Sequence, residues 1–172
     1  MDSITPLSVG QVVPDFALFD LRGVLHTLYQ YRGRISIVYF WSAECPWVER
    51  CDAQMAVLQK TWGETVVFLP VASNAHETEA EQHQAALDRS LPVVLRDPDQ
   101  VLARLFAAQA TPQCFLIDAE GILRYRGAVD DVTYRKKNAE HFYLSEAVKA
   151  VLAGLRPEIE ETPAYGCAIV SL

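Results

Sequence analysis

The sequence predicts an α/β fold in which a mixed central sheet is flanked by helices on both faces. Two observations support this prediction. Runs of β-branched and aromatic residues alternate along the chain with longer stretches of helical periodicity, an order typical of parallel βαβ units. The last two strand candidates are joined only by the tight turn Ala119-Glu120-Gly121, which indicates an antiparallel hairpin and therefore a mixed sheet.

Each expected element follows from a local pattern. Buried strands are expected at residues 35–41, 66–72, 92–95, 114–117 and 122–126, and helices at residues 46–62, 77–90, 99–108 and 139–152. Pro46 suits the first position of a helix, and Gly154 suits the position just after a helix ends. Residues 1–30 form an irregular N-terminal segment with short strands expected at residues 16–18 and 26–28. We expect one domain at residues 1–155 and a C-terminal tail with a Gly-Cys pair at residues 156–172.

Composition and charge exclude several classes of partner. A chain of 172 residues suits one domain with a substantial core, and a net charge of −7 argues against nucleic acid or an anionic membrane. No apolar run approaches the ~20 residues that span a bilayer. The N-terminal residues 1–6 lack the basic and apolar regions of a secretory signal. We therefore expect a cytoplasmic protein.

The cysteines favour thiol chemistry over a static disulfide framework. The chain has four cysteines, at positions 45, 51, 114 and 167, and thiols of cytoplasmic proteins are more often reactive or metal-binding. No Cys-x-x-Cys pair occurs, which argues against a zinc ribbon. The four histidines show no ligand spacing, so we expect no metal site.

Cys45 stands where the strand expected at residues 35–41 gives way to the helix that starts at Pro46. A helix N-terminus offers unpaired backbone N–H groups and the positive end of the helix dipole, and both stabilise a thiolate. Glu44 and Glu49 act in the opposite direction, because nearby negative charge raises the pKa of a thiol. We interpret Cys45 as a reactive cysteine.

Four motifs follow one another along the chain. Residues 13–23 read Val-Pro-Asp-Phe-x-Leu-x-Asp-x-x-Gly, residues 40–46 read Phe-Trp-x-x-x-Cys-Pro, Thr111-Pro112 precedes a hydrophobic strand, and residues 166–169 read Gly-Cys-Ala-Ile. In this order and spacing the motifs resemble the thioredoxin-like superfamily. Within it, the chain is most similar to the redoxin branch associated with alkyl hydroperoxide reductase and thiol-specific antioxidant proteins (AhpC/TSA).

The resemblance implies a thioredoxin-like fold with an N-terminal strand extension. It also implies a cis peptide bond at Thr111–Pro112, beside which an extended substrate strand binds. This chain departs from the family patterns at three positions. Val48 stands where thioredoxins carry a second cysteine, and Tyr39 stands where they carry a buried acid. Pro112 stands where peroxiredoxins carry a peroxide-binding arginine.

Three other features of the sequence are considered for a part in the site, namely Ser42, Trp47 and the pair Asp130-Asp131. Ser42 keeps only the hydroxyl of the threonine that precedes the peroxiredoxin cysteine, and we include it among the substrate-binding candidates. Trp47 either belongs to the core or offers an apolar surface for docking a substrate. Asp130-Asp131 is interpreted as a solvated turn.

The cysteine that resolves an oxidised Cys45 is left open between two candidates. On an intact helix Cys45 and Cys51 have Cα atoms about 10 Å apart, whereas a disulfide needs about 7 Å or less. Cys51 is therefore expected to be a core-facing thiol, and Cys114 a buried one. Cys167 lies on a tail of unknown path, and the resemblance to tailed members of the family favours it as the partner.

We expect a thiol-dependent redox protein, most simply a thiol-disulfide oxidoreductase that uses Cys45 as nucleophile and Cys167, or else Cys51, to resolve the product. No cofactor is needed, since sulfur itself carries the electrons. The partners would be protein or small-molecule thiols and disulfides, or peroxides, and a homodimer is possible. The alternatives are a thiol peroxidase, a copper-binding protein that uses soft thiolates, and a non-catalytic protein on a redoxin scaffold.

Overall fold

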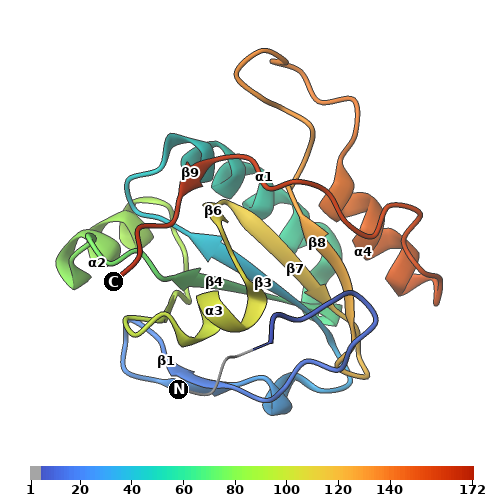
Figure 1. Cartoon of the computed structure of the whole chain (residues 1–172), viewed down its shortest axis with the longest axis horizontal. Coiled ribbons are helices and arrows are strands. Elements are labelled where there is room, and N and C mark those ends of the chain that lie inside the picture. Colours follow the sequence, from blue (N-terminus) through green and yellow to red (C-terminus); the bar gives the residue numbers. More distant parts are fainter. Residues whose placement is uncertain (1–4) are drawn as a thin grey trace.

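The computed structural model describes residues 5–172; residues 1–4, on which part of the argument against a secretory signal depends, lie outside the described residues. A five-stranded sheet with the order β5-β4-β3-β7-β8 forms the centre (Figure 1). The strands are β3 (Ile35–Trp41), β4 (Val66–Ala72), β5 (Leu95–Arg96), β7 (Gln113–Ile117) and β8 (Leu123–Gly127). The first three run parallel and the last two join antiparallel. The predicted mixed sheet is confirmed.

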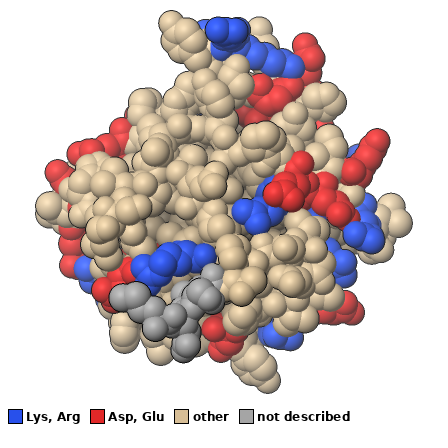
Figure 2. All heavy atoms as spheres, viewed as in Figure 1, with Lys and Arg blue, Asp and Glu red and all other residues tan. Residues whose placement is uncertain are grey.

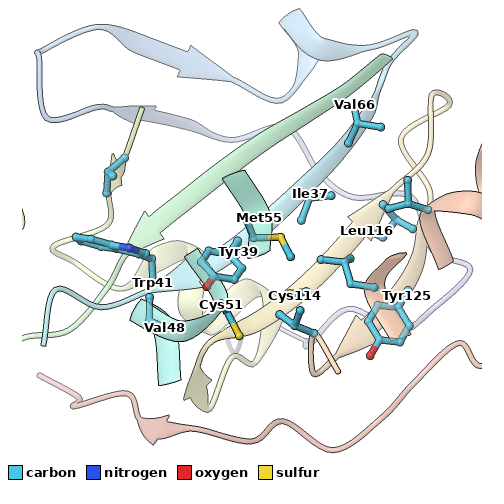
Figure 3. Packing of buried hydrophobic residues seen from close by; sticks show 14 of the residues in the cluster. Ile37, Tyr39, Trp41, Val48, Cys51, Met55, Val66, Cys114, Leu116 and Tyr125 are labelled. Carbon is cyan, nitrogen blue, oxygen red and sulfur yellow. The ribbon is translucent and has the colours of Figure 1, made fainter. Parts of the chain in front are cut away.

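Four helices cover the two faces of this sheet. They are α1 (Pro46–Trp62), α2 (Glu79–Asp88), α3 (Val101–Phe106) and α4 (Tyr143–Leu152). Because successive residues of a strand point to opposite faces, β3 supplies both cores and is buried along its whole length. Ile37, Tyr39 and Trp41 pack with residues of α1, α2 and α4 (Figure 3), whereas Val38 and Phe40 pack with α3 and the N-terminal segment.

Several elements are shorter than the sequence predicts. Helix α2 begins at Glu79 rather than at residue 77, because the Thr78 hydroxyl and the Glu81 carboxylate form a reciprocal capping box. The strand expected at residues 92–95 pairs with β4 only at Leu95 and Arg96. The N-terminal extension is the hairpin of β1 (Ala17–Phe19) and β2 (Leu25–Thr27).

The tail folds back along the domain. Backbone N–H groups of Arg126 and Thr162 donate to carbonyls of Glu160 and Arg126, so residues 160–162 run beside β8. The chain then reaches β9 (Cys167–Ala168), which pairs antiparallel with β6 (Ala110–Thr111) near the start of α1 (Figure 1). The tail therefore crosses the end of the sheet where β3 leads into α1. Among residues 5–172, the helices are all too short or too polar to span a membrane.

Candidate functional site

Cys45 is the residue that caps the N-terminus of α1. Its backbone is extended (φ −78°, ψ 118°), and its carbonyl accepts the N–H groups of Val48 and Glu49, each at 3.1 Å. Its own N–H donates to the Ser42 hydroxyl oxygen at 3.2 Å. The residue is only 2% exposed. The Cys45 sulfur therefore lies at the N-terminal end of a 17-residue helix, where the helix dipole favours a thiolate over a thiol.

Cys45 and Cys167 form a disulfide. Their Cα atoms lie 6.1 Å apart, within the ordinary range for this bond, although 122 positions separate them in the sequence. The Cys45 sulfur also lies 3.2 Å from the carbonyl oxygen of Thr111. Of the two resolving candidates, this structure brings Cys167 to Cys45.

Thr111 and Pro112 lie opposite Cys45, and the peptide bond between them is cis. Both residues are buried. Thr111 is paired with Cys167 in the β6–β9 ladder, and its hydroxyl donates to the Cys167 carbonyl at 3.5 Å. The tail thus occupies the position that the family resemblance assigns to an extended substrate strand.

Ser42 holds the loop before Cys45 in place. Its buried hydroxyl donates to the Glu77 carboxylate and accepts the N–H groups of Glu44 and Cys45 at 3.3 and 3.2 Å. Glu77 also accepts the Ala43 N–H at 3.1 Å. The Ser42 hydroxyl is thus engaged by Glu77 and by its own loop in this structure, and its substrate-binding role stays a prediction.

A second polar network supports the same loop from α1 and α2. The Arg89 guanidinium donates to the carbonyls of Ser42 and Ala43 and, at 3.2 Å, to the Asp52 carboxylate. Its central carbon lies over the Trp41 ring, 5.4 Å from the ring centroid. Asp52 also accepts the Trp41 indole N–H at 2.9 Å. Burial raises the pKa of Asp52, although the hydrogen bond from Trp41 and the charge of Arg89 oppose this shift.

The buried acid of this site comes from the helix rather than from the strand. Tyr39, at the position where the resemblance expects an acid, donates its hydroxyl to Asp52 at 3.1 Å. Asp52 lies on α1 seven residues after Cys45, which is two helical turns along the same face. The sequence patterns did not point to Asp52, Glu77 or Arg89 as residues of the site. A carboxylate at the spacing of the core-facing positions of α1 was the one sign of Asp52.

Cys51 and Cys114 are free thiols in the core, as expected. Burial raises the pKa of Cys51 to about 12, despite the positive charge of neighbouring Arg50, and raises the pKa of Cys114 well above its usual range. Both side chains face the packed interior between β3, β7 and α1 (Figure 3). The protonated thiol is therefore the form that both residues hold at neutral pH.

The interpretation of Asp130-Asp131 as a solvated turn is wrong for Asp130. The Asp130 residue is 4% exposed, and its carboxylate accepts two hydrogen bonds of 2.9 Å from the Arg50 guanidinium. A planar guanidinium that bonds both carboxylate oxygens is a strong form of ion pair. Asp131 is half-buried and pairs with Lys136, which lowers the pKa of Asp131 to about 2.

Trp47 is half-buried and meets the tail. Its ring packs against the Tyr165 ring at a centroid distance of 5.0 Å. Whether the exposed part of Trp47 docks a substrate stays a prediction. In the described part of the chain, residues 5–172, no three side chains of histidine, cysteine, aspartate or glutamate gather as they would around a metal ion.

Comparisons with solved structures show the fold. A hypothetical protein from Sinorhizobium meliloti superposes with a TM-score of 0.85 at 28% identity, over 96% of this chain and 95% of that one. An uncharacterized conserved protein from Geobacillus kaustophilus superposes with a TM-score of 0.88 at 22% identity, over 96% and 93%. The thioredoxin domain of a thiol-disulfide oxidoreductase from Bacteroides vulgatus gives 0.61 at 20% identity, over 68% and 86%. The thioredoxin-like fold is confirmed.

Sequence comparisons agree with this fold. The thiol-disulfide oxidoreductase ResA of Geobacillus thermodenitrificans is 30% identical over 121 residues, which are 68% of this chain and 67% of that protein. The thiol:disulfide interchange protein DsbE of Vibrio cholerae is 30% identical over 129 residues, 74% of this chain and 68% of that protein. The model of the AhpC/TSA family matches residues 9–126. The chain, as its motifs predict, belongs to the AhpC/TSA family of the thioredoxin-like superfamily.

Proposed function

We propose that this protein is a thiol-disulfide oxidoreductase that alternates between a Cys45–Cys167 disulfide and two free thiols. One observation carries the proposal: a cysteine at the N-terminus of α1 is joined to a cysteine of the tail, directly beside Thr111. The relatives named ResA and DsbE, thiol-disulfide oxidoreductase and interchange proteins, support the same reaction class.

In the reducing direction, the Cys45 thiolate attacks one sulfur of a substrate disulfide. The substrate S–S bond breaks, a mixed disulfide with Cys45 forms, and the other substrate sulfur leaves as a thiolate that takes a proton from solvent. The Cys167 thiolate then attacks the Cys45 sulfur and displaces the second substrate thiolate. Two electrons pass to the substrate, and the Cys45–Cys167 disulfide forms. A dithiol reductant must reduce this disulfide before the next cycle, and the same steps in reverse oxidise a dithiol substrate.

Cys51 does not fit the resolving role in this scheme. Helix α1 runs unbroken from Pro46, so residues 45 and 51 have Cα atoms about 10 Å apart. The raised pKa of Cys51 also keeps its thiol protonated. The cytoplasmic location expected from the sequence and the possible homodimer remain proposals.

The test is the chemistry of the reduced protein with a simple disulfide. Fully reduced protein is mixed with oxidised glutathione, quenched with acid at intervals, and mapped by mass spectrometry. We expect a transient glutathione adduct on Cys45, followed by the Cys45–Cys167 disulfide and two equivalents of free glutathione. Cys45→Ser is expected to abolish the reaction, whereas Cys114→Ala is the matched control. Undiminished turnover by Cys45→Ser would overturn the proposal.

A further inference from the structure

The contacts that hold the tail across the site indicate which kind of substrate the site accepts. We propose that the groove filled by residues 166–170 binds, in place of the tail, an extended segment of a substrate protein in which glycine directly precedes the reactive cysteine. This inference rests on the proposed function and names its substrate class. It extends the site well past Thr111–Pro112, to two buried amide side chains.

The tail is held mainly through its backbone. Beyond the β6–β9 pairing, the Ile169 N–H donates to the Gln109 carbonyl at 3.0 Å. The Val170 carbonyl accepts the Ala75 N–H at 3.1 Å. These contacts need an extended chain but no particular side chains.

Asn74 and Gln100 complete this backbone recognition. The Val170 N–H donates to the Asn74 amide oxygen at 2.9 Å, and the Gln100 amide nitrogen donates to the Val170 carbonyl at 2.7 Å. Gln100 also accepts the Leu172 N–H at 3.2 Å. Asn74 and Gln100 are 7% and 6% exposed, so both residues are buried parts of the protein rather than surface side chains. Together these two side chains bind backbone groups of Val170 and Leu172, which lie three and five residues after Cys167.

Backbone groups supply most of the polar contacts of residues 166–170, and the side chains of this segment are at most half-buried. Ala168 and Val170 are exposed, and Cys167 and Ile169 are half-buried. Figure 2, in the same view as Figure 1, shows mostly uncharged atoms where β6 and β9 lie. A different polypeptide could form the same backbone hydrogen bonds, each worth about 1 kcal/mol net. The tail is therefore replaceable by another extended strand once the disulfide is open.

Gly166 sets the one strict requirement on sequence. A Cβ atom at this position would overlap the Thr111 carbonyl oxygen and lie 2.7 Å from the Thr111 carbonyl carbon and 3.1 Å from the Pro112 Cδ. Both of those residues are buried, and their backbone cannot give way as a flexible side chain would. A strand that brings its sulfur to Cys45 along this path must carry glycine just before the cysteine.

The substrate strand and the tail compete for the same groove, and this competition couples disulfide formation to product release. In the mixed disulfide the substrate strand fills the groove and the tail is displaced. The Cys167 thiolate reaches the Cys45 sulfur only when the tail returns to β6, and the tail then takes the hydrogen bonds of the departing strand. As the Cys45–Cys167 bond forms, the bond from Cys45 to the substrate breaks, and the substrate leaves as a thiolate that is protonated by solvent.

The experiment uses the full-length Cys167→Ser protein and two peptides whose cysteine carries a 2-thiopyridyl leaving group. Their sequences are Gly-Cys-Ala-Ile-Val-Ser and Ala-Cys-Ala-Ile-Val-Ser, and stopped-flow absorbance follows the released thiopyridone. We expect the glycine peptide to react roughly tenfold faster, because the added methyl overlaps fixed backbone. N-methylation of its valine, which removes the N–H that Asn74 would accept, should slow it about fivefold. Both peptides should react equally with free glutathione.

The small disulfide 4,4′-dithiodipyridine separates the two levels of the proposal. If it reacts with Cys45 while the glycine and alanine peptides react at equal rates, the groove inference is wrong and the proposed function stands. If Cys45 reacts with no disulfide, the proposed function itself fails. A stable dimer that exchanges tails and excludes both peptides would also overturn the inference, because the occupant would then be a second copy of this chain.

Discussion

Trp47 and Tyr165 meet edge to face, with ring centroids 5.0 Å apart and ring planes at 86°. Trp47 lies two residues after Cys45, and Tyr165 lies two residues before Cys167, so the aromatic pair borders the disulfide. The Tyr165 hydroxyl also accepts the Tyr134 N–H at 2.7 Å. The contact therefore joins the first turn of α1 to the approach of the tail.

Tyr165→Leu is expected to make the Cys45–Cys167 disulfide easier to reduce. An aromatic pair contributes about 0.5–1.5 kcal/mol beyond its buried area, and its loss weakens the docked tail. The reduction potential should rise by about 10–30 mV, measured by equilibration in glutathione redox buffers. Tyr134→Leu is the matched control, since the Tyr134 ring is exposed and the hydrogen bond to Tyr165 comes from the Tyr134 backbone N–H, which the substitution keeps. Equal shifts for both variants would contradict this prediction.

Cys45 is expected to be the fastest-alkylated cysteine of the reduced protein. Its place at the start of α1 favours the thiolate, whereas burial raises the pKa of Cys51 to about 12 and raises the pKa of Cys114 well above its usual range. Iodoacetamide rates for each cysteine, measured between pH 5 and 10 by mass spectrometry, should give an apparent pKa for Cys45 below about 8.5. Faster labelling of Cys51 in the folded protein would contradict the assignment of Cys45.

Cys167→Ser and Cys51→Ser are expected to behave differently. Without Cys167, the mixed disulfide between Cys45 and glutathione should persist, because no other thiol reaches the Cys45 sulfur. Cys51→Ser should leave the rate of disulfide closure nearly unchanged, with some loss of stability from placing a hydroxyl in the core. Intact-mass spectra over time provide the measurement. A Cys45–Cys51 disulfide in the Cys167→Ser protein would show that the first turns of α1 unwind.

Disulfides are expected to oxidise Cys45 faster than hydrogen peroxide does. Pro112 stands where the peroxidase branch of the family carries its arginine, and the Arg89 guanidinium is already engaged with two carbonyls and Asp52. Stopped-flow fluorescence of the reduced protein should give a peroxide rate constant close to that of a free thiol. A rate constant several orders of magnitude higher would favour a thiol peroxidase.

The contribution of Asp52 to the free energy of unfolding is expected to fall as the pH rises. Burial raises its pKa above the ordinary value of 3.8, so the folded state binds this proton more tightly than the unfolded state does. Its contribution is fully present below about pH 3.8 and is lost as the pH rises through the folded pKa. Urea unfolding from pH 3 to 7 should therefore show wild type losing stability relative to Asp52→Asn across this range. Relative to Glu81→Gln, wild type should instead gain stability as the pH rises, because hydrogen bonds from Thr78 lower the pKa of Glu81.

Local patterns were sufficient to predict the frame of the site. The boundary between β3 and α1 at Cys45 was predicted correctly, because a buried strand, a helix and Pro46 each leave a short-range pattern. The ends of α2 and β5 were not predicted, since a capping box and the extent of strand pairing decide them.

Partners far apart in the sequence explain what the sequence did not reveal. Arg50 and Asp130 are 80 residues apart, and Val170 bonds an asparagine 96 residues earlier. Neither contact leaves a periodic pattern, so the sequence alone reveals neither the burial of Asp130 nor the path of the tail. The network of Glu77, Arg89 and Asp52 is of the same kind, because it joins one loop to two different helices.

The pairing of β9 with β6 has a consequence for solubility. When the tail leaves, it uncovers the edge of β6, and exposed strand edges commonly seed aggregation. Strand β6 has only two residues, and Pro112 follows it directly with no N–H to offer. Such an edge is too short to template the growth of a sheet. When the disulfide opens, this edge therefore offers pairing to a single extended segment, and its two residues do not support a growing sheet.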